Sequence, residues 1–295
     1  MESIDRRSFL KTTGATLATA ALASAPSHAA AAAPDGVQWK KAFMYGGALK
    51  SGTVQDEFQL LKDAGFEGVE IQSPNNVDRD EIVRARDKTG IVIHGVCCSK
   101  HWESPLSDPD PQVIEKCKAS VRQALADCQA YGGTTVLVVP AVVKKNVTYR
   151  DAYTRSQAAI RSLIPDAEKH GVKIAIEEVW NKFLLTPPEF VRYIDEFQSP
   201  WVGAYFDVGN VVEYGFPEQW IRELGKRILK LHIKEYGRQK RFNYPLGEGD
   251  IDWAAVRSAL IEVGYNGWIS AEVPKGDLAA LKDVVRRMDQ VLGTA

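Results

Sequence analysis

Four apolar segments in the second half of the sequence end in side chains that can bind a metal ion. The first ends in Glu177 and Glu178, and the others end in Asp207, His232 and Glu272. A single carboxylate at a strand end is usually a loop cap or a solvent-facing charge. Several carboxylates in one place repel each other, and buried charges are almost always paired or bound to a metal. The pattern therefore favours one shared metal site.

The types of these ligands restrict the metal. Carboxylate oxygens are hard donors, and three of them with one imidazole suit Mn²⁺, Mg²⁺ or Co²⁺ and leave positions for substrate oxygens. We expect one divalent ion, with Mn²⁺ first; Zn²⁺ is less favoured, although it also binds histidine and carboxylate. None of the four segments ends in a cysteine, which argues against a structural zinc site.

Other polar residues near these segments are candidates for contact with substrate. Lys234 shares a strand face with His232, so it either binds a substrate oxygen or neutralises a carboxylate. Trp180 and Asn181 follow the first segment, either as a wall for a sugar ring or as packing under the loop. His94 lies on an earlier strand, as a substrate contact or as a core histidine. Glu70 ends another strand and is expected to be a loop partner.

The elements that must position these residues alternate regularly from residue 41 onward. Short apolar runs predict strands, and amphipathic stretches between them predict helices. The strands are expected at 41–45, 68–72, 91–97, 135–140, 173–179, 202–207, 229–234 and 268–273. The helices are expected at 54–64, 79–89, 111–131, 150–170, 187–197, 217–224, 253–263 and 278–292.

Eight strand–helix units predict a single α/β domain, a closed (βα)₈ TIM barrel. Chemistry in such a barrel lies at the carboxyl ends of the strands, where the candidate ligands stand. The alternative is an open doubly wound sheet, but no glycine-rich phosphate turn follows the first strand.

The first 33 residues are expected to be an export signal and an alanine-rich linker. Arg6 and Arg7 open a twin-arginine motif, and a weakly apolar stretch leads to a small-residue cleavage site near Ala29. That stretch is too short for a stable membrane span, which needs about 20 strongly apolar residues. We expect residues 34–295 to form the catalytic barrel. The Tat export machinery would carry it to the periplasm or otherwise out of the cytoplasm.

The composition favours a small-molecule partner. The net charge is −1, with acidic and basic residues interspersed, so the basic face of a nucleic-acid-binding protein is not expected. The four cysteines are too few for a disulfide framework and are expected to be buried thiols. The sequence leaves open whether the chain forms a homo-oligomer.

Five motifs contain the candidate ligands or lie near them: IEEVWN at 176–181, FDVGN at 206–210, LHIK at 231–234, LGEGDIDW at 246–253, and GYNGW at 264–268, which leads into Glu272. Together they resemble the xylose-isomerase-like superfamily of sugar isomerases and epimerases. By this resemblance the metal ligands are Glu177, Asp207, His232 and Glu272. The two glutamates are also the expected acid/base pair, as in the tagatose/psicose 3-epimerase and hydroxypyruvate isomerase branches.

Two positions differ from the family pattern, and the place of a third residue is open. Glu178 stands where related sequences often carry Asn, and Asn210 stands where the epimerase branch tends to carry His. The substrate-gripping arginine is either Arg238 or Arg241. Consecutive strand residues face opposite sides, so only one of the paired glutamates points inward, and the motif indicates Glu177. Asn210 and Arg241 complete the candidate substrate contacts.

The resemblance implies proton transfer beside the carbonyl of a small keto-sugar, through an enediolate that the metal stabilises. We expect an unphosphorylated substrate, because sugar phosphates are scarce outside the cytoplasm and no strand-end glycine turn offers a phosphate nest. Elimination from a 3-keto-glycoside, a lyase reaction, is the alternative. An AP-endonuclease-like metal nuclease is a remote one, since it needs a histidine-rich site and the sequence has five histidines in all.

Overall fold

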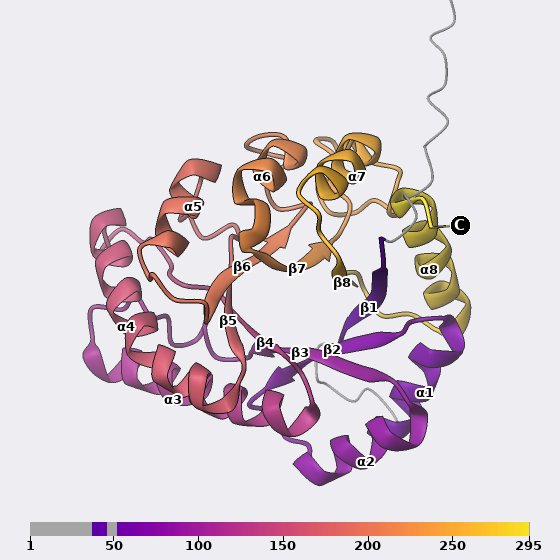
Figure 1. The fold of residues 1–295 in the computed structure, drawn as a ribbon, viewed down its shortest axis with the longest axis horizontal. Helices are drawn as coiled ribbons and strands as arrows, with labels where there is room; N and C mark the ends of the chain where they lie inside the picture. The colour runs from indigo at the N-terminus through magenta and orange to yellow at the C-terminus, as the bar shows by residue number, and fades with distance from the viewer. Residues whose placement is uncertain (1–36, 46–51, 295) are drawn as a thin grey trace, which may run out of the picture. The chain divides into compact units, whose positions relative to one another are not determined.

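The computed structural model describes residues 37–45 and 52–294, so the expected signal and linker lie outside the described residues. Eight parallel strands close into one barrel in chain order, with β1 paired to β8 (Figure 1). This confirms the predicted (βα)₈ fold. The strands are β1 (Trp39–Tyr45), β2 (Gly68–Ser73), β3 (Val92–Cys98), β4 (Thr135–Val138), β5 (Lys173–Glu177), β6 (Val202–Asp207), β7 (Ile228–Ile233) and β8 (Gly267–Ala271).

A helix follows each strand and covers the outside of the barrel (Figure 1). Every strand and every α-helix begins and ends within two residues of its predicted bounds. The helices are α1 (Val54–Ala64), α2 (Arg79–Thr89), α3 (Pro111–Tyr131), α4 (Tyr149–His170), α5 (Pro187–Asp195), α6 (Pro217–Leu224), α7 (Trp253–Glu262) and α8 (Leu278–Leu292), and the short 3₁₀ helix η1 (Gly225–Arg227) precedes β7.

Local signals mark the helix ends. Thr53 and Asp56 form a capping box at the start of α1, and Gly65 ends that helix in the left-handed region with φ of 105°. Asp252 caps α7 by accepting a hydrogen bond from the backbone of Ala255 at 3.0 Å. These features fix where each helix begins and ends. They therefore restrict the positions of the neighbouring strand ends, which carry the site.

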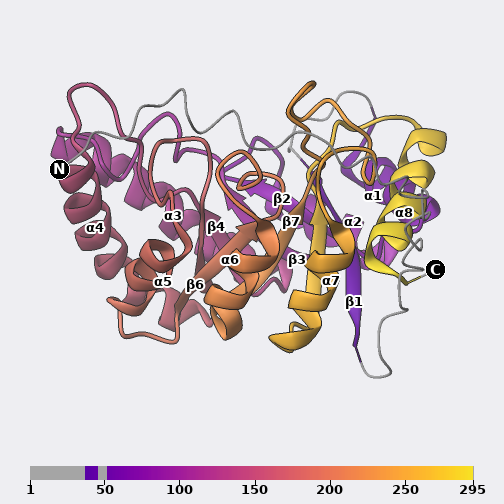
Figure 2. The same cartoon turned by 90° about the horizontal axis from the view of Figure 1, so that it is seen from above.

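Inward-facing side chains fill the barrel in layers. Near the amino ends of the strands His94 stacks on Trp268 with ring centroids 4.9 Å apart, and Tyr205 and Ser270 lie in the next layer. The long loop between β7 and α7 extends beyond the strand ends (Figure 2). All four cysteines are buried free thiols, as expected. In the described part of the chain, no helix is both long and apolar enough to cross a membrane.

Candidate active site

The carboxyl ends of four neighbouring strands bring four side chains together. Glu177 and Asp207 are the last residues of β5 and β6, His232 lies next to the last residue of β7, and Glu272 follows β8 directly. Each offers one ligand atom, and these atoms all lie within 4.8 Å of one another. We refer to these four residues as the metal cluster.

His232 lies at the centre of the metal cluster. Its Nδ1 is 2.9 Å from Glu177 Oε1 and 3.7 Å from Glu272 Oε2, and its Nε2 is 2.8 Å from Glu70 Oε2. Burial alone would lower the pKa of His232, but the negative charges of Glu70 and Glu177 hold it well above its usual value. The cluster therefore attracts positive charge.

Lys234 supplies a second positive charge at the edge of the metal cluster. Its Nζ lies 2.6 Å from Glu272 Oε2 and 3.1 Å from Asp207 Oδ2. Burial raises the pKa of Asp207 to about 6, and the ammonium of Lys234 opposes that effect. These contacts are those of a residue that neutralises carboxylates, one of the two roles expected for it.

The two adjacent glutamates face different surroundings. Glu177 points into the metal cluster, whereas Glu178 accepts a hydrogen bond from the backbone N–H of Asp207 at 2.9 Å. Its other oxygen is buried and has no hydrogen-bond partner among the described residues. Burial and the charges of Asp207 and Glu177 raise the pKa of Glu178 well above its usual value. Glu178 therefore supports the end of β6 through its hydrogen bond to the backbone of Asp207.

Asn210 braces the same strand end. Its backbone N–H donates to Asp207 Oδ1 at 2.9 Å, and its side-chain amide donates to the carbonyl of Glu178 at 2.9 Å. The carbonyl of Asn210 in turn accepts a hydrogen bond from the indole N–H of Trp180 at 2.9 Å. Asp207 is held in one orientation by these contacts.

The donor set of the metal cluster fits a divalent cation. Three carboxylates and an imidazole converge in a buried place, and only Glu272, with 33% of its side chain exposed, opens to solvent. Carboxylates this close together are stable only with positive charge between them, which His232 and Lys234 now supply in part.

A family model described as "Xylose isomerase-like TIM barrel" matches residues 58–291. The chain belongs to this family. A second model, for the twin-arginine translocation pathway signal sequence, matches residues 3–23.

Relatives of this xylose isomerase-like barrel include several sugar epimerases. L-ribulose-5-phosphate 3-epimerase UlaE of Escherichia coli (strain K12) is 24% identical over 250 residues, which are 78% of this chain and 88% of the relative. The structure of 3-keto-D-glucoside 4-epimerase, YcjR, from E. coli superposes with a TM-score of 0.75 at 18% identity and covers 86% of this chain and 100% of that one. The IolI protein with a bound zinc atom has a TM-score of 0.73 at 18% identity, covering 86% and 98%.

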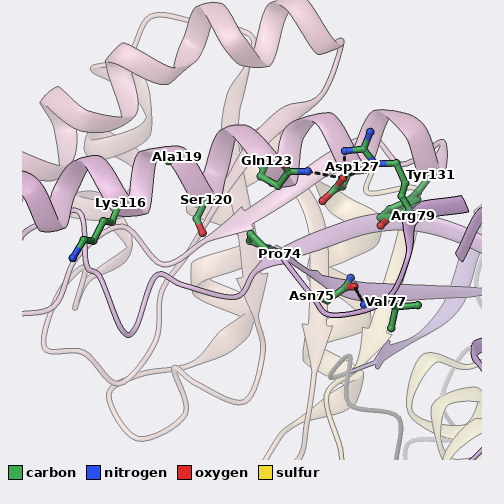
Figure 3. A pocket seen from close by; sticks show the side chains of 10 residues that line it. All are labelled: Pro74, Asn75, Val77, Arg79, Lys116, Ala119, Ser120, Gln123, Asp127 and Tyr131. Carbon is green, nitrogen blue, oxygen red and sulfur yellow. Dashed lines mark hydrogen bonds and ion pairs between the residues drawn. The ribbon is translucent and has the colours of Figure 1, made fainter. Parts of the chain in front are cut away.

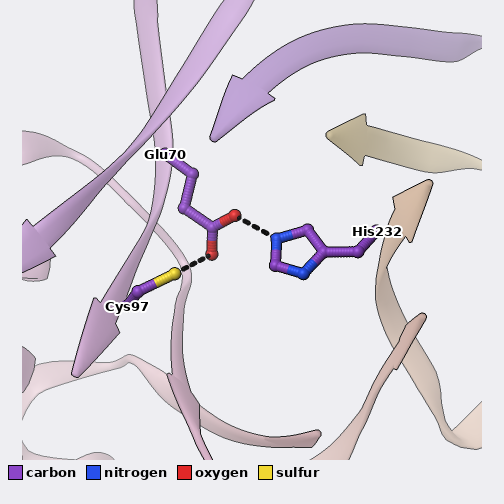
Figure 4. A group of neighbouring side chains, drawn as sticks. All are labelled: Glu70, Cys97 and His232. Atoms are coloured by element: carbon purple, nitrogen blue, oxygen red, sulfur yellow. Dashed lines mark hydrogen bonds and ion pairs between the residues drawn. The ribbon is translucent and has the colours of Figure 1, made fainter. Parts of the chain in front are cut away.

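Glu70 is an acidic residue of this barrel whose place the sequence did not reveal. It was expected to be a loop partner, but it lies fully buried between Cys97 and His232 (Figure 4). It accepts hydrogen bonds from Tyr205 at 2.9 Å and from the thiol of Cys97 at 3.1 Å, in addition to His232. Burial alone would raise its pKa, but the charge and hydrogen bond of His232 lower the pKa of Glu70 to about 2. The sequence does contain one sign of this buried position, because Glu70 is a charged residue within the apolar run GVEI.

Glu70, Cys97 and His232 also lie close enough together to hold a metal ion. However, burial and the charge of Glu70 raise the pKa of the Cys97 thiol. A thiol must lose its proton to bind a metal, so this group is a poor site. We interpret Glu70 as the residue that holds the ring of His232, and Cys97 as a hydrogen-bond donor to Glu70.

Two residues expected to touch substrate are buried and make contacts within the barrel. His94 is buried, with its Nε2 3.0 Å from Ser270 Oγ, and its Nδ1 has no hydrogen-bond partner among the described residues. Asn181 is buried too: its amide donates to the carbonyl of Ala141 at 2.6 Å and accepts from the backbone of Phe183 at 3.0 Å. These contacts engage part of the polar groups of each residue, and a role of either residue in substrate binding stays a prediction.

Trp180 and Arg241 lie at the rim of the barrel mouth. The ring of Trp180 is half-buried and lies 4.9 Å from the ring of Phe242. The guanidinium of Arg241 lies over Trp180 at 5.2 Å and is otherwise open to solvent. Arg238 lines a separate cavity with Asp250, so Arg241 is the better placed of the two arginines.

A cavity of about 750 Å³ lies elsewhere, between α3 and the loop after β2 (Figure 3). Its charged centre is Asp127, which accepts hydrogen bonds from Ser73 at 2.5 Å, from Arg79 Nε at 2.8 Å and from Gln123 at 3.0 Å. This network ties α2 to α3 and leaves the carboxylate fully engaged. The residues that line the cavity include none of the metal cluster.

Proposed function

We propose that this chain is a divalent-metal-dependent enzyme that isomerises or epimerises a small keto-sugar. The observation that carries the proposal is the convergence of Glu177, Asp207, His232 and Glu272 within 4.8 Å at the barrel mouth. The sugar epimerases among the relatives support the same reaction class.

These four residues would hold the metal. When bound there, a divalent ion would polarise the substrate carbonyl and stabilise the negative charge that develops beside it. The chain itself would move the proton. Glu177 and Glu272 come from strands that are separated by β6 and β7, so they reach the site from different sides. One carboxylate would remove a proton from carbon and the other would return one.

The neighbours of these residues would hold the arrangement in place. Glu70 fixes the ring of His232, and Asn210 fixes Asp207. Trp180 and Arg241 at the rim would contact the sugar, together with Lys234. We infer that Mn²⁺ is the natural ion, because oxygen donors dominate the site; zinc, which IolI binds, is the main competitor.

The same proposal includes export. Residues 1–33 would be a Tat signal and linker, removed after the Tat machinery has carried the folded barrel, residues 34–295, to the periplasm. A substrate found there is unphosphorylated, in contrast to the substrate named for UlaE.

The test is to incubate the purified protein with Mn²⁺, Mg²⁺, Co²⁺ or Zn²⁺ and a panel of keto-sugars in D₂O, and to follow the sugars by NMR. We expect metal-dependent exchange of one carbon-bound proton and formation of an epimer or isomer. Release of a leaving group without epimer would assign the lyase reaction. No exchange on any sugar with any of the four ions would refute the proposal.

A further inference from the structure

A second cavity, of about 730 Å³, begins at the metal cluster and extends away from it. Lys234 and Glu272 line its inner end, and residues 242–246 form one wall. The opposite wall consists of Pro274 and the first turns of α8. We call this space the side groove. It lies beside the place where the reacting carbon must sit, because Glu177, Asp207 and His232 do not line it.

The side groove is larger than a single sugar ring requires. A hexose has about twelve non-hydrogen atoms and, at roughly the 30 Å³ that liquid water gives each molecule, needs at most about 360 Å³. A ring held at the metal cluster would therefore leave most of the groove open. A second ring attached to the first would extend into it.

The walls of the side groove suit a neutral sugar ring. Phe242 and Tyr244 are half-buried aromatic residues on one wall, and Val284 is apolar on the other. Aromatic and apolar walls bind the apolar face of a ligand, and polar groups beside them orient its polar edge. Asn243 is exposed on the same loop and can bond to hydroxyl groups.

The charges of the side groove disfavour a phosphate group. Among the described residues that line it, both cations are paired: Arg287 with Asp283 at 2.6 Å and with Glu248 at 2.7 Å, and Lys234 with Glu272 at 2.6 Å. Three carboxylates, those of Glu235, Glu272 and Asp283, line the groove against these two cations, so its net negative charge repels a phosphate dianion.

We propose that the side groove binds the second sugar ring of a neutral keto-glycoside, so that the preferred substrate has two rings. This inference rests on the proposed function, since the first ring is placed at the metal cluster. It adds the class of substrate that the same site takes.

The test uses a matched pair of substitutions on α8. Ala280 lines the side groove, whereas Ala279, its neighbour, is exposed on the same helix and does not. The substitution Ala280→Trp places an indole in the groove; Ala279→Trp places the same group outside it. The Mn²⁺-loaded full chain and both variants are assayed in D₂O with a free ketohexose, its phosphate ester, and a 3-keto-glucoside that carries a second glucose ring.

We expect kcat/KM for the keto-glycoside to exceed that for the ketohexose at least tenfold. Ala280→Trp lowers this ratio at least tenfold, and Ala279→Trp leaves it within twofold. Similar melting temperatures of the two variants show that both are folded. A ratio that Ala280→Trp does not change, or a preference for the phosphate ester, overturns the inference.

The two levels of the proposal fail in different ways. Exchange on the ketohexose without any preference for the keto-glycoside overturns the two-ring substrate and leaves the proposed function standing. Absence of exchange on every sugar removes the proposed function and the inference together.

Discussion

Glu177 and Glu272 are each proposed to bind the metal and to carry a proton. Changing either to Gln deletes an anionic ligand and an acid/base group together, so we expect each variant to lose turnover by about 100-fold or more. If the two carboxylates serve opposite faces of the sugar, one variant still exchanges the carbon-bound proton for deuterium without forming product. NMR in D₂O measures both quantities.

The matched control is Glu178→Gln, because Glu178 lies next to Glu177 but its carboxylate bonds to the backbone of Asp207 and is not among the four converging ligands. We expect it to keep substantially more turnover than Glu177→Gln. The reverse order would mean that Glu178 is the acid/base residue. Wild-type turnover in Glu177→Gln or Glu272→Gln would show that these two residues are not the acid/base pair.

Glu70 is a positioning residue for His232. A carboxylate behind a metal-binding histidine fixes its ring and raises its basicity, and loss of such a partner typically costs 10–100-fold in metal affinity. We expect Glu70→Gln to weaken Mn²⁺ binding by about that factor, with partial recovery of kcat at saturating metal. Metal titration followed by calorimetry measures the Kd.

Cys97→Ala provides the comparison for Glu70→Gln. It removes another hydrogen-bond partner of Glu70 and leaves the contact with His232 intact. We expect its Mn²⁺ affinity to stay within about threefold of wild type, below the range seen when a ligand's partner is lost. Equal affinities in wild type and Glu70→Gln would contradict the positioning role.

At the scale of elements, the loop after β6 must pass close to the end of β7. Gly209 allows this approach, because a Cβ there would lie 2.7 Å from both the Cγ and the carbonyl oxygen of Lys234. We expect Gly209→Ala to push the two segments apart, to lower the free energy of unfolding by about 1–3 kcal/mol and to weaken metal binding. Urea unfolding and metal titration measure these effects.

Gly215, on the same loop, is the control position. A Cβ there meets only the indole of Trp220, at 3.1 Å, and a side chain can shift more easily than backbone. A larger loss of stability in Gly215→Ala than in Gly209→Ala would show that the approach to β7 is not the constraint.

At the scale of the whole molecule, the metal cluster joins four strands of the closed barrel, so a bound ion stabilises the folded state over the unfolded one. At 100 times its Kd, Mn²⁺ should add about 2.7 kcal/mol. For a chain of this size that corresponds to a rise in Tm of roughly 5–10 °C. Thermal unfolding after chelation and after return of the metal measures it.

Asp207→Asn should remove most of that rise, because it deletes a fully buried anionic ligand. A Tm that responds to none of the four divalent ions in the wild-type protein would count against the metal cluster as a metal site.

Export also concerns the whole molecule, and it depends on residues outside the described structure. The match of residues 3–23 to a twin-arginine signal includes Arg6 and Arg7. We expect a reporter fused to residues 1–35 to leave the cytoplasm, and the same fusion with both arginines changed to lysine to remain inside. Cell fractionation distinguishes the two results; equal export of both fusions would refute the Tat route.

The sequence by itself determined the order and type of every strand and α-helix of the barrel. Apolar periodicity, helix caps and glycines at helix ends are local signals, and they place each strand end within two residues. Because parallel strands of a closed barrel all present their carboxyl ends on one side, the grouping of Glu177, Asp207, His232 and Glu272 also followed from the sequence.

Only the tertiary structure decided which residues support or surround that group. Glu70 meets His232 across the barrel from 162 positions away, and a register shift opposite Val69 and Glu70 turns both His94 and Cys97 inward on β3. The side groove likewise forms between the loop after β7 and α8. Such contacts depend on strand register and barrel closure, which no local periodicity encodes.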